Sequence, residues 1–214
     1  MTKLIERAYT PSKVELREAD GRPVLEGYAA LYDSLSVNLG GFVERIAPGA
    51  FDAALESDPD VLCRIQHEDG LQVIGRTKSG TLTLRATSEG LHYTCLVPDT
   101  QAGRDIVELV RRGDIDQSSF AFSIDRDSDE SWDWNHEPTL RTLLRVNLHD
   151  VAPVSTPAYP ETTVGLRAET LERARQVLER ELAQAKRRRD ALRAAHRQRA
   201  EHFRALSARA KSRR

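Results

Sequence analysis

The chain has 214 residues, of which 39% are hydrophobic and 30% are charged. That is enough for one domain with its own core and an appendage, and too little for two full domains. Charged residues begin at Lys3, and no run of about 18 apolar residues occurs, so we expect neither a signal peptide nor a membrane-spanning helix. Cys63 and Cys95 lack the C-x-x-C spacing of a zinc site, and a reducing cytoplasm fits their number better than a disulfide framework.

The net charge of -1 conceals a strong asymmetry along the chain. Residues 167–214 contain 16 Lys and Arg against 6 Asp and Glu, whereas residues 1–166 contain 16 against 27. We therefore expect a domain over residues 1–166 and a separate basic tail over residues 167–214. Such a tail is attracted to acidic protein surfaces or to nucleic acid.

Short strands separated by glycine-containing turns dominate the first half of the chain. The pattern predicts a hairpin over Val14–Tyr32 around Gly21, then a loop over Ser34–Gly41 and a short helix over Phe51–Leu55. Four further strands are predicted at Val61–His67, Val73–Arg76, Thr81–Ala86 and Leu91–Val97. Their spacing is typical of an antiparallel sheet or barrel.

The second half begins with the clearest helix, predicted from Thr100 to Arg112 and ended by Gly113. An unusually apolar strand, Gln117–Ile124, follows it directly and contains two adjacent serines. The acidic segment Asp125–Pro138 is interpreted as a turn or a long hairpin loop. A strand pair is then expected at Leu140–Leu148 and Val151–Val154.

Beyond Gly165 the chain has the composition of a long helix, because it contains no further Pro or Gly. Apolar residues recur there at multiples of seven, namely Leu171, Leu178, Ala185, Leu192 and Leu206. The seam is thin. It fits a marginal coiled coil or a helix that docks onto a partner, and a solvated, partly disordered tail is the alternative.

Candidate chemistry lies in three separate segments of the predicted sheet. A hydrolase with an activated hydroxyl needs a nucleophile, an imidazole that takes its proton and a third group that orients the imidazole. His67 lies where a strand meets a turn, Ser118 and Ser119 lie within the apolar strand, and His149 and Asp150 are neighbours on a later strand. Each of these residues also has an ordinary structural explanation when it is taken alone.

Taken together, several segments resemble the prohead proteases of HK97-like tailed phages. The matching segments are Leu25–Tyr32, Glu44–Phe51, His67 with its following acidic residue, Ile74–Arg76, Gly80–Leu82, Glu89–Leu91, Gly113–Ile115, Ser119–Phe122, Asp150–Val151 and Pro157–Pro160. The resemblance runs from about Val24 to Gly165. The resemblance rests on the order and spacing of these segments together, because no single motif is decisive.

The resemblance implies a catalytic triad of Ser119 as nucleophile, His67 as general base and Asp150 as the group that orients His67. The family usually has Glu in the third position. Ser118 is the alternative nucleophile, and His149 is the alternative third member because the related herpesvirus assembly proteases use a second histidine there. Ala121 replaces the Gly that usually follows the Phe after the nucleophile.

The resemblance also implies a mainly β fold of the α+β class, a herpesvirus-protease-like antiparallel β-barrel flanked by helices. The implied function is that of a serine endopeptidase that cleaves the scaffolding segment of the major capsid protein, and itself, during prohead maturation. It would act inside the prohead, in the host cytoplasm, without a cofactor or metal, and we expect it to self-associate.

Two rival hypotheses remain for the chain. In the first, a catalytically inactive capsid assembly or scaffold protein acts through its helical tail. In the second, the tail binds nucleic acid, which its composition disfavours because Phe203 is its only aromatic residue. For the protease itself, we expect the tail to dock on scaffold or capsid helices and so package the enzyme.

Overall fold

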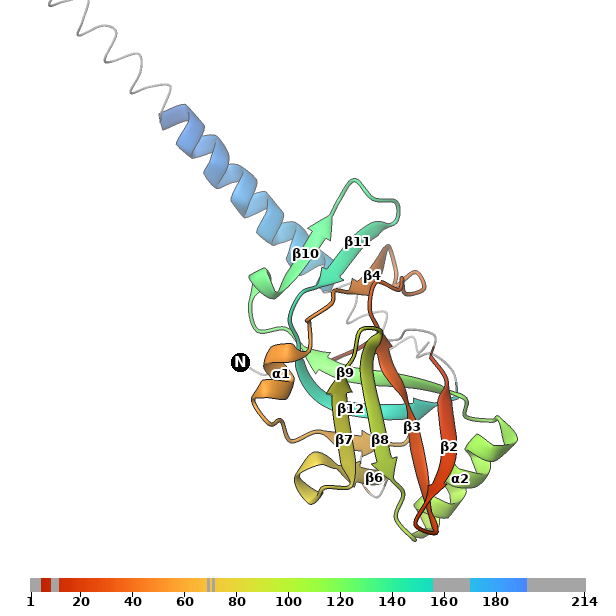
Figure 1. Cartoon of the computed structure of the whole chain (residues 1–214). Helices are drawn as coiled ribbons and strands as arrows, with labels where there is room; N and C mark the ends of the chain where they lie inside the picture. The colour runs from red at the N-terminus through yellow and green to blue at the C-terminus, as the bar shows by residue number, and fades with distance from the viewer. Residues whose placement is uncertain (1–4, 9–11, 69, 71, 156–169, 192–214) are drawn as a thin grey trace, which may run out of the picture. The chain divides into compact units, whose positions relative to one another are not determined.

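The computed structural model describes residues 5–8, 12–68, 70, 72–155 and 170–191 (Figure 1). The chain divides into two compact units, Met1–Ala168 and Glu169–Arg214. In the second unit the described residues 170–191 form one helix. The predicted heptad positions Leu192 and Leu206 lie outside the described residues, as does the Pro157–Pro160 motif.

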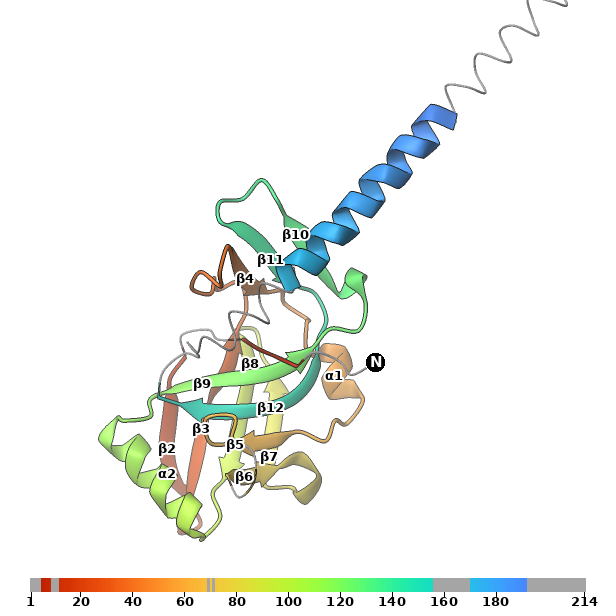
Figure 2. The ribbon, with the colours of Figure 1, turned by 180° about the vertical axis from the view of Figure 1, so that it is seen from behind.

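The described part of the first unit contains twelve strands in three sheets, shown from two sides in Figures 1 and 2. The five-stranded sheet has the order β1 (Glu6–Ala8), β9 (Gln117–Ser123), β12 (Asn147–Val154), β5 (Leu62–Arg64) and β6 (Val73–Arg76). The four-stranded sheet has the order β2 (Val14–Ala19), β3 (Arg22–Leu31), β8 (Gly90–Leu96) and β7 (Leu82–Ala86). The three-stranded sheet has the order β10 (Glu130–Asp133), β11 (Thr139–Leu143) and β4 (Phe42–Ile46).

Two α-helices and two short 3-10 helices complete the described elements of this unit. They are α1 (Asp52–Glu56), α2 (Gln101–Arg112), η1 (Thr77–Ser79) and η2 (Asp127–Asp129). The α2 helix begins where the hydroxyl of Thr100 accepts the Gly103 amide, and it ends at Gly113, whose φ of 81° suits glycine. No helix among the described residues is both long and apolar enough to cross a membrane.

The core lies between the five-stranded and four-stranded sheets, and aromatic side chains of β9 are at its centre. Phe120 packs edge-on against Phe51 at 5.3 Å between ring centroids and stacks on Phe122 at the same distance. Phe120 and Phe122 point to the same face of β9 because alternate residues of a strand do so. The apolar character of Gln117–Ile124 therefore reflects a strand that is buried on both faces.

A buried ion-pair network links the five-stranded sheet to the three-stranded sheet. Arg141 of β11 has no exposed surface, and its Nη1 contacts Glu6 of β1 at 2.5 Å and Glu44 of β4 at 2.9 Å. Its Nη2 contacts Glu130 of β10 at 2.6 Å. Burial alone would lower the pKa of Arg141, but the surrounding carboxylates outweigh burial and raise that pKa above its usual value. Arg141 therefore stays charged.

The mainly β, α+β class is confirmed, and the expected closed antiparallel barrel is not what the sheets form. Two strand pairs are parallel, β12 with β5 and β11 with β4. The segment interpreted as a loop, Asp125–Pro138, contains β10, because Trp132 alternates with exposed neighbours and pairs opposite Arg141. The predicted pair Leu140–Leu148 and Val151–Val154 is also wrong, since β11 and β12 join different sheets.

Candidate active site

Strand β9 presents its two serines to opposite sides of the five-stranded sheet. Ser118 points to the same face as Phe120, where its hydroxyl lies 2.9 Å from the Tyr93 hydroxyl in the core. Ser119 points to the other face and is 2% exposed. Alternation along the strand thus separates two neighbours with the same chemistry, because each one meets a different environment.

His67 lies in a tight turn that follows β5. The sequence pattern predicted that the strand continues to His67, but β5 ends at Arg64, because Gln66 and His67 adopt left-handed conformations with φ of 55° and 59°. The Glu68 amide closes the turn by donating to the Ile65 carbonyl at 2.9 Å. Residues other than glycine seldom adopt such φ values, and they do so mainly in turns and at functional sites.

Contacts with the end of β12 hold this turn in place. The Gln66 amide donates to the Pro153 carbonyl at 3.1 Å, and its side-chain Nε2 donates to Ser155 Oγ at 2.7 Å. The Ser155 amide donates back to Gln66 Oε1 at 3.3 Å. These bonds offset the cost of the left-handed backbone and fix the direction of the neighbouring imidazole.

His67 bridges Ser119 and Asp150 through its two ring nitrogens. Its Nε2 is 2.8 Å from Ser119 Oγ, and its Nδ1 is 2.5 Å from Asp150 Oδ1. His67 is 6% exposed and Asp150 9% exposed, so water screens these hydrogen bonds weakly. The structure thus brings together three candidates from segments far apart in the sequence.

His149 does not join this group, although it precedes Asp150 directly. The register of β12 against β9 shifts between Leu148 and Asp150, so that His149 is the extra residue of a bulge. Its Nε2 lies 2.9 Å from Ser123 Oγ, at the far end of β9 from Ser119. The two alternative candidates, Ser118 and His149, therefore both have partners other than His67.

A buried hydroxyl, an imidazole and a carboxylate in this order have the geometry of a hydrolytic triad. With Nδ1–H donating to Asp150, Nε2 is free to accept the Ser119 proton. Arg64 adds a positive charge, because its Nε lies 3.8 Å from Asp150 Oδ2. Among the described residues no group of His, Cys, Asp and Glu is arranged to hold a metal ion.

The N-terminal strand β1 lies along the outer edge of β9, antiparallel to it. Ala8 pairs with Phe120 and Arg7 with Ala121, and after residues 9–11 the pairing resumes with Lys13 opposite Gln117. The Arg7 guanidinium donates to the His67 carbonyl at 3.2 Å. The chain's own N-terminal segment therefore pairs with β9, the strand that carries Ser119. The pairing covers positions of β9 both before and after Ser119.

Three residues around the site had not been singled out from the sequence. Gln66 and Arg64 flank the histidine turn, and Arg7 reaches it from the N-terminal strand. None of them carries a motif, since each acts through a contact with a distant segment. Only the position of Gln66 next to a candidate histidine offered a signal.

A family model described as caudovirus prohead serine protease matches residues 10–177. The chain belongs to this family. The resemblance expected from the motifs is therefore confirmed, and family membership supports a serine protease role in capsid maturation.

Among solved structures, one similar to this chain is that of the capsid assembly protease of bacteriophage T4. It has 14% sequence identity and a TM-score of 0.46, over 72% of this chain and 97% of that chain. No curated protein matches the chain. The assignment to the prohead serine protease family accordingly rests on the family model.

Proposed function

We propose that this prohead protease family member is an active serine endopeptidase in which Ser119, His67 and Asp150 are the catalytic residues. The observation that carries the proposal is the continuous hydrogen-bond chain from Ser119 Oγ through both nitrogens of His67 to Asp150. In line with its family, we propose that it cleaves the scaffolding segment of the major capsid protein inside the prohead.

The first half of the reaction forms an acyl-enzyme. Ser119 Oγ attacks the carbonyl carbon of the scissile peptide bond, and His67 Nε2 takes the hydroxyl proton. Asp150 stabilises the resulting imidazolium through Nδ1–H. His67 then donates the proton to the departing amine, so the C–N bond breaks and an ester to Ser119 remains.

The second half regenerates the enzyme with the same groups. A water molecule donates its proton to His67 Nε2 as its oxygen attacks the ester carbonyl. When the ester bond breaks, the proton returns from His67 to Ser119 Oγ and the acid product leaves. Asp150 again holds the imidazole in the orientation that both steps need.

Cleavage of the chain itself is part of the proposal, and the position of β1 supports it. An extended substrate commonly binds a protease by adding to a strand edge, where main-chain hydrogen bonds align it with the nucleophile. Residues Glu6–Ala8 already form such an antiparallel pairing with β9. The chain's own N-terminal segment therefore already lies along the edge of the strand that carries Ser119.

Co-expression with the major capsid protein of the same phage or prophage tests the proposal. The wild-type chain should shorten the capsid protein, and Ser119→Ala and His67→Ala should not. Ser118→Ala is the matched control, because it removes an identical hydroxyl from the neighbouring position, and it should still process. Continued processing by Ser119→Ala would overturn the assignment of the nucleophile.

The rival hypothesis of an inactive assembly protein requires a wild-type chain that leaves the capsid protein intact in this experiment. An inactive descendant has no need to keep a buried triad in hydrogen-bonding geometry. Ala121, which replaces the usual Gly, has an ordinary place in the ladder, opposite Asp150 on β12 and Arg7 on β1. The geometry therefore favours the active enzyme.

For the tail, we propose that residues 167–214 dock on acidic helices of the scaffold or capsid protein and so package the protease. The excess of basic over acidic residues in this segment supports the proposal. Deleting residues 167–214 should reduce the amount of protease found in purified proheads. Unchanged packaging of the truncated chain would refute the proposal, and loss of packaging with capsid processing intact would separate docking from catalysis.

A further inference from the structure

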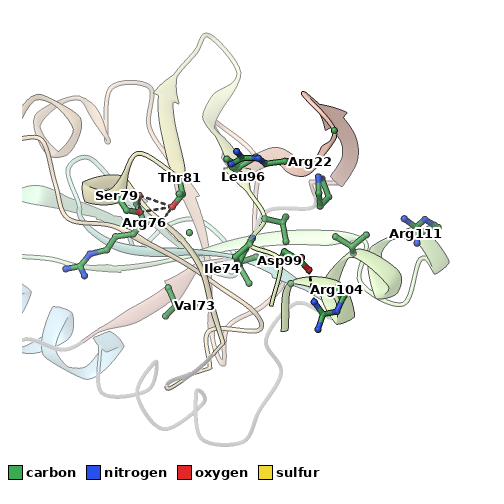
Figure 3. A pocket seen from close by; sticks show the side chains of 17 residues that line it. Arg22, Val73, Ile74, Arg76, Ser79, Thr81, Leu96, Asp99, Arg104 and Arg111 are labelled. Atoms are coloured by element: carbon green, nitrogen blue, oxygen red, sulfur yellow. Dashed lines mark hydrogen bonds and ion pairs between the residues drawn. The ribbon is translucent and has the colours of Figure 1, made fainter. Parts of the chain in front are cut away.

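A large cavity lies away from the triad, at the edge of the five-stranded sheet formed by β6. Its volume is about 980 Å³, and its walls come from β6, the turn before β3, the end of β8 and one face of α2 (Figure 3). All of its lining residues are among those that the structure describes. The volume is at the upper end of the range of pockets that bind ligands of moderate size.

The cavity is apolar on its inner side, with Ile74, Val97, Pro98 and Val107 among its lining residues. Close packing behind the inner wall explains why Gly75 lies in that wall. A Cβ atom on Gly75 would lie 2.5 Å from Cys95 Sγ, so this wall has no room for a side chain. A ligand that fills the space must place apolar groups against this wall. Polar groups in the same position would lose their contacts with water and find few hydrogen-bond partners.

The rim, in contrast, carries several arginines. Arg22, Arg76, Arg104 and Arg111 all line the cavity, and Figure 3 shows them on different sides of it. Residues 1–166 contain 16 basic residues in total, so a quarter of them gather here in a region with an acidic excess. This concentration marks the cavity as a site that attracts anions.

Neighbouring acids neutralise only part of this charge. Arg76 pairs with Asp60, Arg104 with Asp99 and Arg111 with Glu108, at 2.5 to 2.6 Å. The Arg22 side chain has no hydrogen-bond or ion-pair partner in the part of the chain that the structure describes. Lys78 also contacts Asp60, at 3.2 Å, and adds a further positive charge beside the rim. The rim therefore keeps a net positive charge and one arginine ready for a ligand.

We infer that this cavity binds an acidic segment of a protein partner, with carboxylates on the arginine rim and apolar side chains against Ile74 and Val107. The absence of aromatic residues from the lining argues against single-stranded nucleic acid, which binds through bases stacked on aromatic rings. Arginine recognises carboxylates through paired hydrogen bonds, which suits a peptide rich in glutamate or aspartate.

The cavity and the triad belong to different parts of the same sheet. Ser119 lies on β9, and β12 and β5 separate it from β6. At about 4.8 Å between neighbouring strands, three intervals separate β9 from β6 by about 14 Å. No residue of the cavity belongs to the triad, so binding there leaves the catalytic groups unoccupied and the inference does not depend on the proposed function.

Fluorescence anisotropy of a fluorescein-labelled peptide of glutamate and leucine tests the inference. The full-length chain carries Ser119→Ala so that the probe stays uncut. The double variant Arg22→Glu/Arg104→Glu should bind the peptide about tenfold more weakly than this parent, because attraction becomes repulsion at the rim. The control Arg17→Glu/Arg85→Glu makes the same charge change outside the cavity and should bind within about twofold of the parent.

The basic tail also attracts acidic peptides, so the location of binding needs its own measurement. A photo-crosslinking version of the peptide should mark residues of β6, β8 or α2 in the parent protein, a result that does not depend on how any cavity variant folds. Crosslinks confined to residues 167–214 would overturn the inference. Equal affinity of parent and cavity variant would also overturn it, as would equal binding of a peptide with glutamine in place of glutamate. Competition by oligothymidine that depends on Arg22 would identify nucleic acid as the occupant instead.

Discussion

Ser118 and Ser119 have identical side chains but different roles, because they point to opposite faces of β9. The Ser118 hydroxyl completes a buried hydrogen bond with Tyr93, and burial raises the pKa of Tyr93 so that its phenol stays neutral. The Ser119 hydroxyl instead meets an imidazole nitrogen. The first contact contributes to folding, and the second provides a nucleophile.

Substituting the two serines should therefore give opposite results. Ser118→Ala leaves the Tyr93 hydroxyl without its partner and should lower the free energy of unfolding by about 1 to 3 kcal/mol, with little change in kcat for peptide hydrolysis. Ser119→Ala should lower kcat by about four orders of magnitude or more and leave stability nearly unchanged. Urea unfolding and turnover of a capsid-derived peptide measure both quantities. A large loss of kcat in Ser118→Ala would contradict this division.

The third member of the triad is tested by a pair of adjacent substitutions. Asp150→Asn keeps the shape of the side chain but presents an amide to Nδ1, which favours the wrong imidazole tautomer, and should lower kcat about 10⁴-fold. His149→Ala should change kcat by less than about threefold, because its ring contacts Ser123 and not His67. If His149→Ala proved as damaging as Asp150→Asn, the second-histidine alternative would have to be revived.

At the scale of elements, the turn that carries His67 depends on a contact between distant segments. Two left-handed residues in succession are held by hydrogen bonds from Gln66 to Pro153 and Ser155. β12 thus contributes twice, since it supplies Asp150 and also anchors the turn at its other end. The orientation of the imidazole is consequently a property of two elements together.

Removing the Gln66 side chain should loosen this turn without touching the reacting groups. Gln66→Ala is expected to lower kcat by roughly 10- to 100-fold with little effect on KM, because small displacements of a catalytic group are costly. Steady-state kinetics of Gln66→Ala, Ser155→Ala and the double variant form the test. If the two side chains act through their mutual bond, the double variant should be no slower than Gln66→Ala, and fully additive losses would argue against it.

The sequence predicted local elements well and long-range pairing poorly. The hairpin of β2 and β3, the helix α2 and the strand β9 follow from turns, caps and periodicity, which are local signals. The parallel pairing of β12 with β5 does not, because nothing in either segment encodes its partner. The strand β10 was missed because one of its buried positions is the charged Glu130, so its alternating burial does not appear as alternating hydrophobicity in the sequence.

The candidate site shows the same limit. His67 and Ser119 were found because motifs surround them, and Asp150 was preferred over His149 on the same basis. The left-handed turn could not be anticipated, since neither Gln66 nor His67 is a residue type that signals positive φ as glycine does. Arg7 was missed because its partner is a main-chain carbonyl, which has no sequence signature.

At the scale of the whole domain, the Arg141 network connects β1 of the five-stranded sheet with the three strands of the smaller sheet. Three carboxylates surround one guanidinium, and all four side chains are buried. A buried group of this kind is stable only while the opposite charge is present. The packing of the five-stranded sheet against the three-stranded sheet therefore depends on the charge of Arg141.

Arg141→Met should destabilise the domain by about 3 to 5 kcal/mol at pH 7, because three buried carboxylates lose their counter-charge. In this variant the folded state should bind protons more readily than the unfolded state does. Its free energy of unfolding should therefore rise as pH falls from about 7 to about 5. Urea unfolding at both pH values, with the exposed substitution Arg85→Met as control, measures this recovery. A loss of stability that does not shrink at the lower pH would indicate lost packing rather than unpaired charge.

The two buried cysteines can be used to measure how often the core of the domain opens. Cys63 on β5 and Cys95 on β8 come from different sheets, and neither has exposed surface. The hydrogen bond to Cys95 and burial together raise the pKa of the Cys63 thiol, which keeps it unreactive in the closed protein. A thiol-specific reagent added under native conditions would react only when the sheets part. Its labelling rate would therefore time the opening of the core at β5, the strand next to the one that carries Asp150.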